Sequence, residues 1–174
     1  LPDDFTLEMP VAGLLWITRG GLHMDDARRY GWGWSEKHQR VIMPVYDNDE
    51  LVAVQARAVH SWMKPKYLSQ MWSGPRATFH AGNRHAGTLV LCEDMLSAAR
   101  VGKVTDAWSL LGTNLMPAVI QRIVASPYTR IRVWMDDDEA GHNARKKILR
   151  ALGAVGIEAT AIVSDRDPKL HTLE

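Results

Sequence analysis

Residues 131–141 read Ile-Arg-Val-Trp-Met-Asp-Asp-Asp-Glu-Ala-Gly, so an apolar run ends in three consecutive aspartates at 136–138. A second apolar run at residues 88–92, Thr-Leu-Val-Leu-Cys, ends on Glu93. Each pattern predicts a buried strand that ends in carboxylates directly before a helix. The two segments together predict that acidic side chains gather where two strands of one sheet end.

These acidic strand ends have two interpretations. Ligands of open α/β sheets bind outside the carboxyl ends of the strands, and Mg²⁺ prefers oxygen ligands, so a divalent-metal site is one interpretation. Capping of the following helix is the other, and a single Asp would favour it. The acid triplet combined with Glu93 on a separate strand favours the metal site. Because successive strand residues point to opposite faces, Asp136 and Asp138 are expected to converge while Asp137 points away.

Strands and helices alternate from residue 87 onward. Strands are predicted at 88–92, 106–110, 130–135 and 158–163, and helices at 95–102, 115–125 and 139–152. This alternation predicts an α/β fold with a parallel sheet flanked by helices. We expect the subdomain to span residues 87–172, and we exclude residues 173–174 as a candidate vector remnant.

A smaller α+β subdomain is expected over residues 1–86. A helical segment at 11–29 is interrupted at Gly20-Gly21, and two strands at 40–46 and 51–57 flank a turn. Residues 61–87 contain several Gly and Pro and are expected to form loops.

Composition restricts the class of protein. Apolar residues make up 46% of the 174 and charged residues 24%, as in ordinary globular domains. No apolar stretch approaches the roughly 20 residues that a membrane-spanning helix needs, so no membrane partner is expected. The single cysteine, Cys92, excludes a disulfide framework and a cysteine zinc ribbon within these residues.

The net charge of +1 conceals a basic stretch, because no Asp or Glu occurs between Leu51 and Cys92. Arg and Lys alternate there with Trp, Tyr and Phe, and this mixture suits single-stranded nucleic acid: basic groups neutralise phosphates and aromatic rings stack on bases. A solvated basic face with its aromatic residues in the core is the equal alternative. The candidate nucleotide or nucleic-acid contacts in this stretch are Arg57, Lys66, Tyr67 and Arg84.

The succession of Glu93, Asp136-x-Asp138 and an Asp167-Pro168 loop resembles the Toprim fold of primases, topoisomerases and related nucleases over residues 88–169. Three upstream segments resemble the basic amino-terminal subdomain of DnaG-type primase RNA polymerase cores. They read RVIMPVYD at 40–47, VQAR at 54–57 and PKYLS at 65–69. The chain departs from the family pattern at Asp94, Ser97, Asp137 and Lys169, and these departures resemble phage-encoded primases.

The resemblance implies an enzyme, a DNA-directed RNA polymerase that makes short RNA primers on single-stranded DNA from nucleoside triphosphates. It implies Glu93, Asp136 and Asp138 as catalytic residues and metal ligands, Asp167 as a further ligand, and two Mg²⁺ or Mn²⁺ ions as cofactors. It also implies a replicative helicase as partner, in the same or a separate polypeptide, and the cytoplasm of a bacterial host as location. Two alternatives remain open: a Toprim nuclease, and a non-catalytic nucleic-acid-binding module of the same fold.

Overall fold

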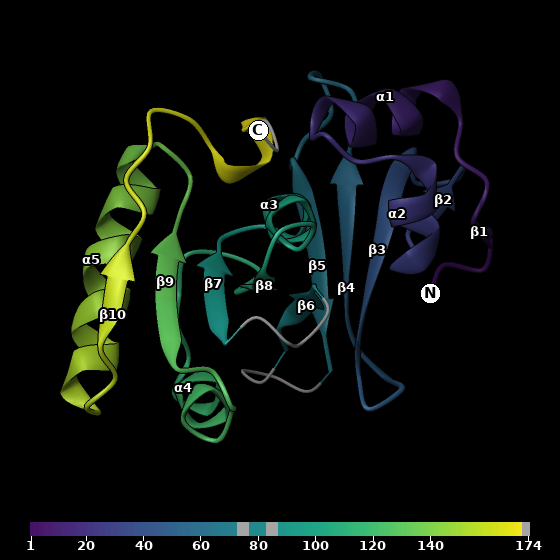
Figure 1. The fold of residues 1–174 in the computed structure, drawn as a ribbon. Coiled ribbons are helices and arrows are strands. Elements are labelled where there is room, and N and C mark those ends of the chain that lie inside the picture. The colour runs from purple at the N-terminus through teal and green to yellow at the C-terminus, as the bar shows by residue number, and fades with distance from the viewer. Residues whose placement is uncertain (73–76, 83–86, 172–174) are drawn as a thin grey trace. The chain divides into compact units, whose positions relative to one another are not determined.

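The computed structural model describes residues 1–72, 77–82 and 87–171 (Figure 1). The chain divides into two units, unit 1 at Leu1–Ala77 and unit 2 at Thr78–Glu174. This division precedes the boundary expected at residues 86–87. The reason is a strand at Phe79–Ala81 (β6), in a region expected to be loop, that pairs with the sheet of unit 2.

Unit 1 contains an antiparallel sheet with the strand order β1-β2-β3-β4-β5. Its strands are β1 (Phe5–Thr6), β2 (Gly33–Ser35), β3 (Arg40–Asp47), β4 (Glu50–Ala58) and β5 (Tyr67–Met71). The predicted hairpin of β3 and β4 is confirmed, and its turn residues Asn48 and Asp49 have φ values of 49° and 66°. Asn and Asp tolerate these left-handed values, which a tight hairpin turn requires. The strands β1, β2 and β5 were not predicted.

Two short helices, α1 (Val11–Arg19) and α2 (Met24–Arg29), confirm the predicted helical segment and its interruption. Gly21 lies between them with φ of +70°, a conformation that favours glycine. The core of unit 1 is apolar, and its largest fully buried side chains are Trp32, Ile17, Leu22, Ile42, Met43, Val41 and Val45.

Unit 2 contains a sheet with the order β10-β9-β7-β8-β6. The strands β7 (Thr88–Cys92), β8 (Asp106–Ser109), β9 (Arg130–Trp134) and β10 (Ala159–Ala161) are parallel, and β6 is antiparallel to β8. The predicted parallel α/β sheet is therefore confirmed, with β6 as an added edge strand.

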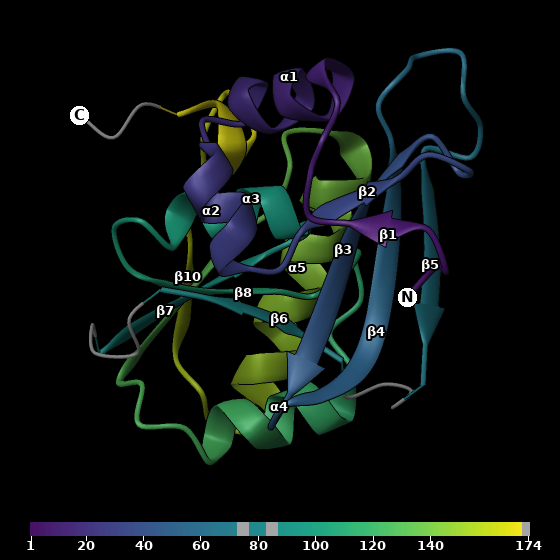
Figure 2. The ribbon, with the colours of Figure 1, turned by 90° about the vertical axis from the view of Figure 1, so that its right-hand side faces the viewer.

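Helices cover both faces of this sheet. The helices of unit 2 are α3 (Met95–Val101), α4 (Pro117–Val124) and α5 (Glu139–Ala154), followed by the 3-10 helix η2 (Pro168–Leu170). Val119 of α4 and Ile148 of α5 belong to one core cluster with alternate residues of β7 and β9, such as Leu91 and Val133. Helix α3 packs on β6, β7 and β8, and in Figure 2 it lies on the opposite side of β8 from α4. In the described residues, no helix is long and apolar enough to span a membrane.

Candidate active site

The acids of unit 2 follow neighbouring strands. Strands β7 and β9 are parallel and paired, with Cys92 opposite Trp134 in the register. The residues that follow these positions leave the sheet at the same edge, which brings Glu93 and Asp94 next to the segment that begins at Met135. The prediction that acids from two distant segments meet at one sheet edge is thus supported by the strand register.

Two of these acids begin helices. Asp94 accepts a hydrogen bond from the backbone N–H of Ser97 at 2.7 Å, and Asp138 accepts one from Gly141 N–H at 2.7 Å. They are the N-caps of α3 and α5. Helix capping was the alternative to metal binding in the sequence analysis. In the structure Asp138 caps α5 through Oδ1, so its other carboxylate oxygen is not used by the cap.

Gly141 allows the close approach of α5 to the aspartate segment. A Cβ atom at this position would lie 2.2 Å from the backbone oxygen of Asp136, far inside van der Waals contact. A side chain at residue 141 would therefore push the aspartates away from the start of α5. The glycine two residues after Glu139 is a local requirement of this site.

Lys169 joins three of the acids. Its Nζ lies 2.8 Å from Asp94 Oδ2, 2.8 Å from Asp136 Oδ2 and 3.0 Å from Asp167 Oδ2. The lysine side chain is 19% exposed, so these contacts are largely sheltered from solvent. The three loops after β7, β9 and β10 thus meet at a single ammonium group.

Asp137 points to a different neighbourhood, as expected. Its Oδ1 lies 2.8 Å from His142 Nε2, one turn into α5. Its backbone N–H donates to Asp167 Oδ1 at 3.0 Å, which ties the loop after β10 to the loop after β9. The side chain of Asp137 therefore contacts a histidine of α5, while its backbone N–H positions Asp167.

Burial and the charges of neighbouring acids raise the pKa values of two of these acids. Burial, and then the charges of Asp136, Asp138 and Asp94, raise the pKa of Glu93 to about 7, although Lys169 opposes this shift. Burial and Asp94 also raise the pKa of Asp136, against the stabilising hydrogen bond from Lys169. Burial lowers the pKa of Lys169, but Asp94 and Asp136 outweigh burial and raise it above its ordinary value. The group has more negative charge than Lys169 can neutralise.

A divalent cation would fit this donor set chemically. Within the part of the chain that the structure describes, Glu93 Oε2 and Asp136 Oδ1 are buried oxygens without a hydrogen-bond partner. Buried carboxylate oxygens are costly unless they are paired. In the described ranges, no three His, Cys, Asp or Glu side chains form a ready metal-binding group. The carboxylates instead converge on Lys169. That Glu93, Asp136, Asp138 and Asp167 share one set of ions stays a prediction.

The predicted basic contacts of unit 1 differ in their surroundings. The guanidinium of Arg57 lies 4.7 Å from the ring centroid of Tyr67 and 5.5 Å from that of Trp16. Lys66 is exposed, and its backbone oxygen accepts a hydrogen bond from Ala58 N–H at 3.0 Å. Arg84 lies outside the described residues. Arg57 is therefore packed between aromatic rings, whereas Lys66 presents its ammonium to solvent.

The sequence did not single out Asp94 or Lys169 as site residues. Asp94 directly follows Glu93 and precedes a helix, so its cap position was a usable signal. Lys169 was noted only as a departure in the last loop, and nothing local predicts that it returns to contact Asp94, 75 residues earlier.

Comparisons with known proteins agree with this fold. A family model described as Toprim-like matches residues 90–169. A comparison with curated protein sequences gives no significant match. Unit 2 has the Toprim fold.

Solved structures extend the similarity over both units. The zinc-binding and RNA polymerase domains of the Aquifex aeolicus primase match 89% of this chain with a TM-score of 0.74 and 16% identity. The DnaG catalytic core matches 94% of this chain with a TM-score of 0.71 and 17% identity. The primase fragment of the bacteriophage T7 primase-helicase matches 97% of this chain with a TM-score of 0.65 and 14% identity. The three matches cover 50%, 69% and 74% of those chains, so this chain spans half the length of the Aquifex structure. The chain has the fold of primase catalytic cores, with the Toprim unit second.

Proposed function

We propose that this chain is the catalytic core of a DNA primase, which joins nucleoside triphosphates into short RNA primers on single-stranded DNA. The observation that carries the proposal is the extent of the structural similarity. Primase cores match both the antiparallel unit and the Toprim unit, over 89–97% of the chain. A Toprim nuclease would need only the second unit, so similarity across both units favours the primase.

The acids at the edge of the Toprim sheet would hold Mg²⁺ or Mn²⁺. Glu93 and Asp136 are the first candidates, because each has a buried oxygen without a partner. Asp138 keeps one oxygen on the N-terminus of α5, so only its second oxygen is available for a cation. When bound there, a divalent cation would supply positive charge that stabilises the charge developing on a transferred phosphoryl group.

The chain's own residues would orient that reaction. Asp167 is positioned by the backbone of Asp137, and Lys169 neutralises part of the acidic group. Lys66 is exposed and suited to phosphate groups of template or nucleotide, and Arg57 with Tyr67 offers a guanidinium on an aromatic ring. A single-stranded DNA template, nucleoside triphosphates and a replicative helicase are the proposed partners.

The test is to incubate the chain with single-stranded DNA, labelled ribonucleotides and Mg²⁺ or Mn²⁺. Short RNA products that disappear in Glu93→Gln and Asp136→Asn support the proposal. Asp165→Asn is the matched control, because Asp165 is an exposed acid of the same loop that contacts none of the site's acids in the described residues. Degraded DNA would instead identify a nuclease, and neither product would identify a non-catalytic binding module.

A further inference from the structure

Lys169 donates hydrogen bonds to Asp94 and Asp136 and forms an ion pair with Asp167. An ammonium has three N–H donors and no acceptor, and the Nζ atom lies within 3.0 Å of three different carboxylates, those of Asp94, Asp136 and Asp167. Three carboxylate oxygens around one largely sheltered positive charge are the environment that an oxygen-ligated cation would have. The ammonium of Lys169 therefore lies where three carboxylates could otherwise bind a divalent cation.

The backbone around Lys169 keeps the side chain in place. Residue 169 is the middle of η2, and the preceding Pro168 is buried. The backbone oxygen of His171 accepts two hydrogen bonds from Arg100 of α3, at 3.2 and 2.8 Å. Hydrogen bonds therefore hold η2 to α3 through His171 and to the backbone of Asp137 through Asp167. These contacts fix the backbone of Lys169 in a position from which its side chain reaches the acids.

Two buried acceptor oxygens of the acidic group have no hydrogen-bond partner among the described residues. Lys169 binds Asp136 through Oδ2, and the other oxygen, Oδ1, is buried without a partner. Glu93 Oε2 is in the same condition. These two oxygens follow the paired strands β7 and β9, and one divalent cation bound by both would neutralise them.

We propose that Lys169 takes the place of one divalent cation, so that this chain binds one such ion, at Glu93 and Asp136, where the family resemblance implies two. The inference rests on the proposed function only in expecting a divalent ion at this sheet edge. Its physical basis is that an ammonium held within 3.0 Å of Asp94, Asp136 and Asp167 already supplies positive charge to these three acids.

The experiment counts bound Mn²⁺ on the full chain without DNA or nucleotide, by calorimetry and by the electron paramagnetic resonance signal of free Mn²⁺. We expect one ion for the parent and two for Lys169→Asp, with Lys169→Met binding its second ion at least tenfold more weakly than Lys169→Asp. Lys147→Met is the matched control, because Lys147 is an exposed lysine of α5, and it should bind one ion.

Two comparable Mn²⁺ sites in the parent chain would overturn the inference, whether or not the variants fold. A single site in a folded Lys169→Asp would overturn it as well. Since the count is made without substrates, one-ion binding in a chain that makes no primers upholds this inference and refutes only the proposed function.

A second feature of the Toprim unit, independent of the acids, is the exposed side of β9. Strand β9 lies between β7 and β10, and a strand in the middle of a parallel sheet normally has apolar residues on both faces. Here Ile131 and Val133 are buried on one face, while Arg130 and Arg132 are exposed on the other. The strand thus carries two arginines where a covering helix would require apolar side chains.

These arginines line a cavity of about 460 Å³, a size typical of small-ligand sites. Arg100, Thr88, Thr105 and Trp134 also line it, together with Val and Ile side chains, and none of its described lining residues is acidic. The indole N–H of Trp134 is buried and has no hydrogen-bond partner among the described residues. The cavity therefore combines the exposed arginines Arg130 and Arg132 with the indole of Trp134 and an apolar wall.

We infer that this cavity binds a nucleoside monophosphate, with the phosphate on Arg130 and Arg132 and the flat base beside Trp134. Guanidinium groups bind phosphate through paired hydrogen bonds, and an apolar wall with one donor suits a heteroaromatic ring. The acidic group is not required, so divalent ions are not needed for this binding.

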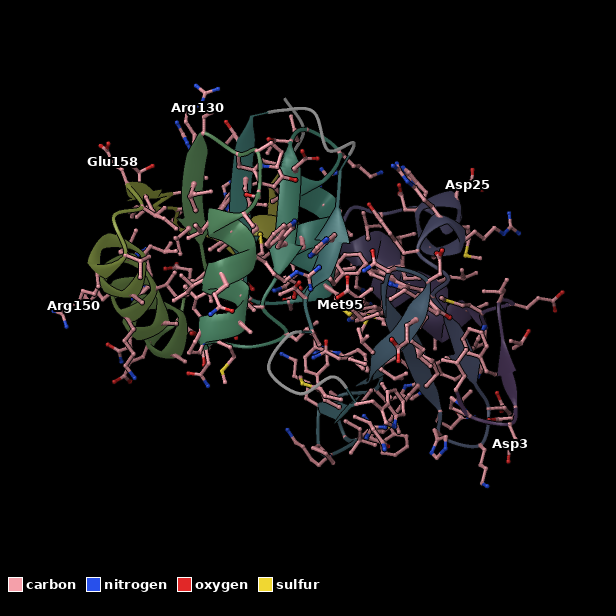
Figure 3. All side chains as sticks on the ribbon, turned by 90° about the horizontal axis from the view of Figure 1, so that it is seen from below. Asp3, Asp25, Met95, Arg130, Arg150 and Glu158 are labelled. Atoms are coloured by element: carbon pink, nitrogen blue, oxygen red, sulfur yellow. The ribbon has the colours of Figure 1, made fainter. Side chains whose placement is uncertain are left out.

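The test is calorimetric titration of the full chain with AMP in the presence of EDTA. We expect saturable binding that weakens at least tenfold in the Arg130→Gln/Arg132→Gln double variant and is unchanged in Arg150→Gln. Figure 3 shows Arg150 projecting from α5, away from Arg130. Adenosine or inorganic phosphate binding as tightly as AMP, or a double variant that binds AMP like the parent, would overturn the assignment.

Discussion

Replacing Glu93 by Gln should stabilise the protein at high pH. The pKa of Glu93 is raised from its ordinary 4.5 to about 7, so the folded state holds this proton more tightly than the unfolded state. The stability contributed by the proton is fully present below pH 4.5 and is lost as the pH rises to about 7. Above that pH the parent carries an ionised carboxylate that is partly buried and close to other acids, whereas the glutamine variant has a neutral side chain at this position.

The size of the effect follows from the shift. A displacement from 4.5 to about 7 corresponds to about 3 kcal/mol at 1.36 kcal/mol per pKa unit. Because Glu93 is only half-buried, solvent screening reduces this to about 1–2 kcal/mol. We therefore expect Glu93→Gln to be more stable than the parent by about 1–2 kcal/mol at pH 8, and equal to it near pH 4.5.

Urea unfolding of parent and variant at both pH values measures this difference. Glu158→Gln, which changes an exposed acid labelled in Figure 3, should leave the stability within about 0.5 kcal/mol at either pH. Mg²⁺ should stabilise the parent at pH 8 more than it stabilises Glu93→Gln, since a ligand of the folded state adds to its stability. The reasoning would be refuted if Glu93→Gln had the same free energy of unfolding as the parent at pH 8, or if it were more stable than the parent by the same amount at pH 4.5.

Three further changes separate structural from functional roles. Gly141→Ala should destabilise by about 3 kcal/mol in urea unfolding, because its Cβ would meet Asp136 O at 2.2 Å, whereas Gly153→Ala, with nothing within 4 Å, should stabilise by about 0.5–1 kcal/mol. Asp138→Ala should cost about 1 kcal/mol through the lost cap, while Asp138→Asn should keep the cap and lose primer synthesis; an active Asp138→Asn would exclude a charge-dependent role. Arg57→Ala should cost about 1 kcal/mol through its lost ring contacts, with no matching cost in thermal unfolding of Lys66→Ala.

The parallel sheet and its acidic edge could be predicted because their signals are local. Apolar runs such as residues 88–92 and 130–134 are strands in the structure, and the acids that follow them leave the sheet together because the strands are parallel neighbours. Asp137 contacts His142 rather than Lys169, in the direction expected, but strand alternation is not the cause, because β9 ends at Trp134. For the same reason alternation did not predict that Asp138 caps α5.

By itself the sequence determined the β3–β4 hairpin and the alternating strands and helices of unit 2, since hydrophobic periodicity and cap residues act over a few positions. It did not determine the short strands β1, β2, β5 and β6. Only the tertiary structure decided which side chains meet. It pairs Phe79–Ala81 with β8, stacks Arg57 on Trp16, and brings Lys169 to Asp94 and Asp136. Contacts between residues 33 or 75 positions apart depend on the order of strands in the sheet and the path of the loops, which no local pattern encodes.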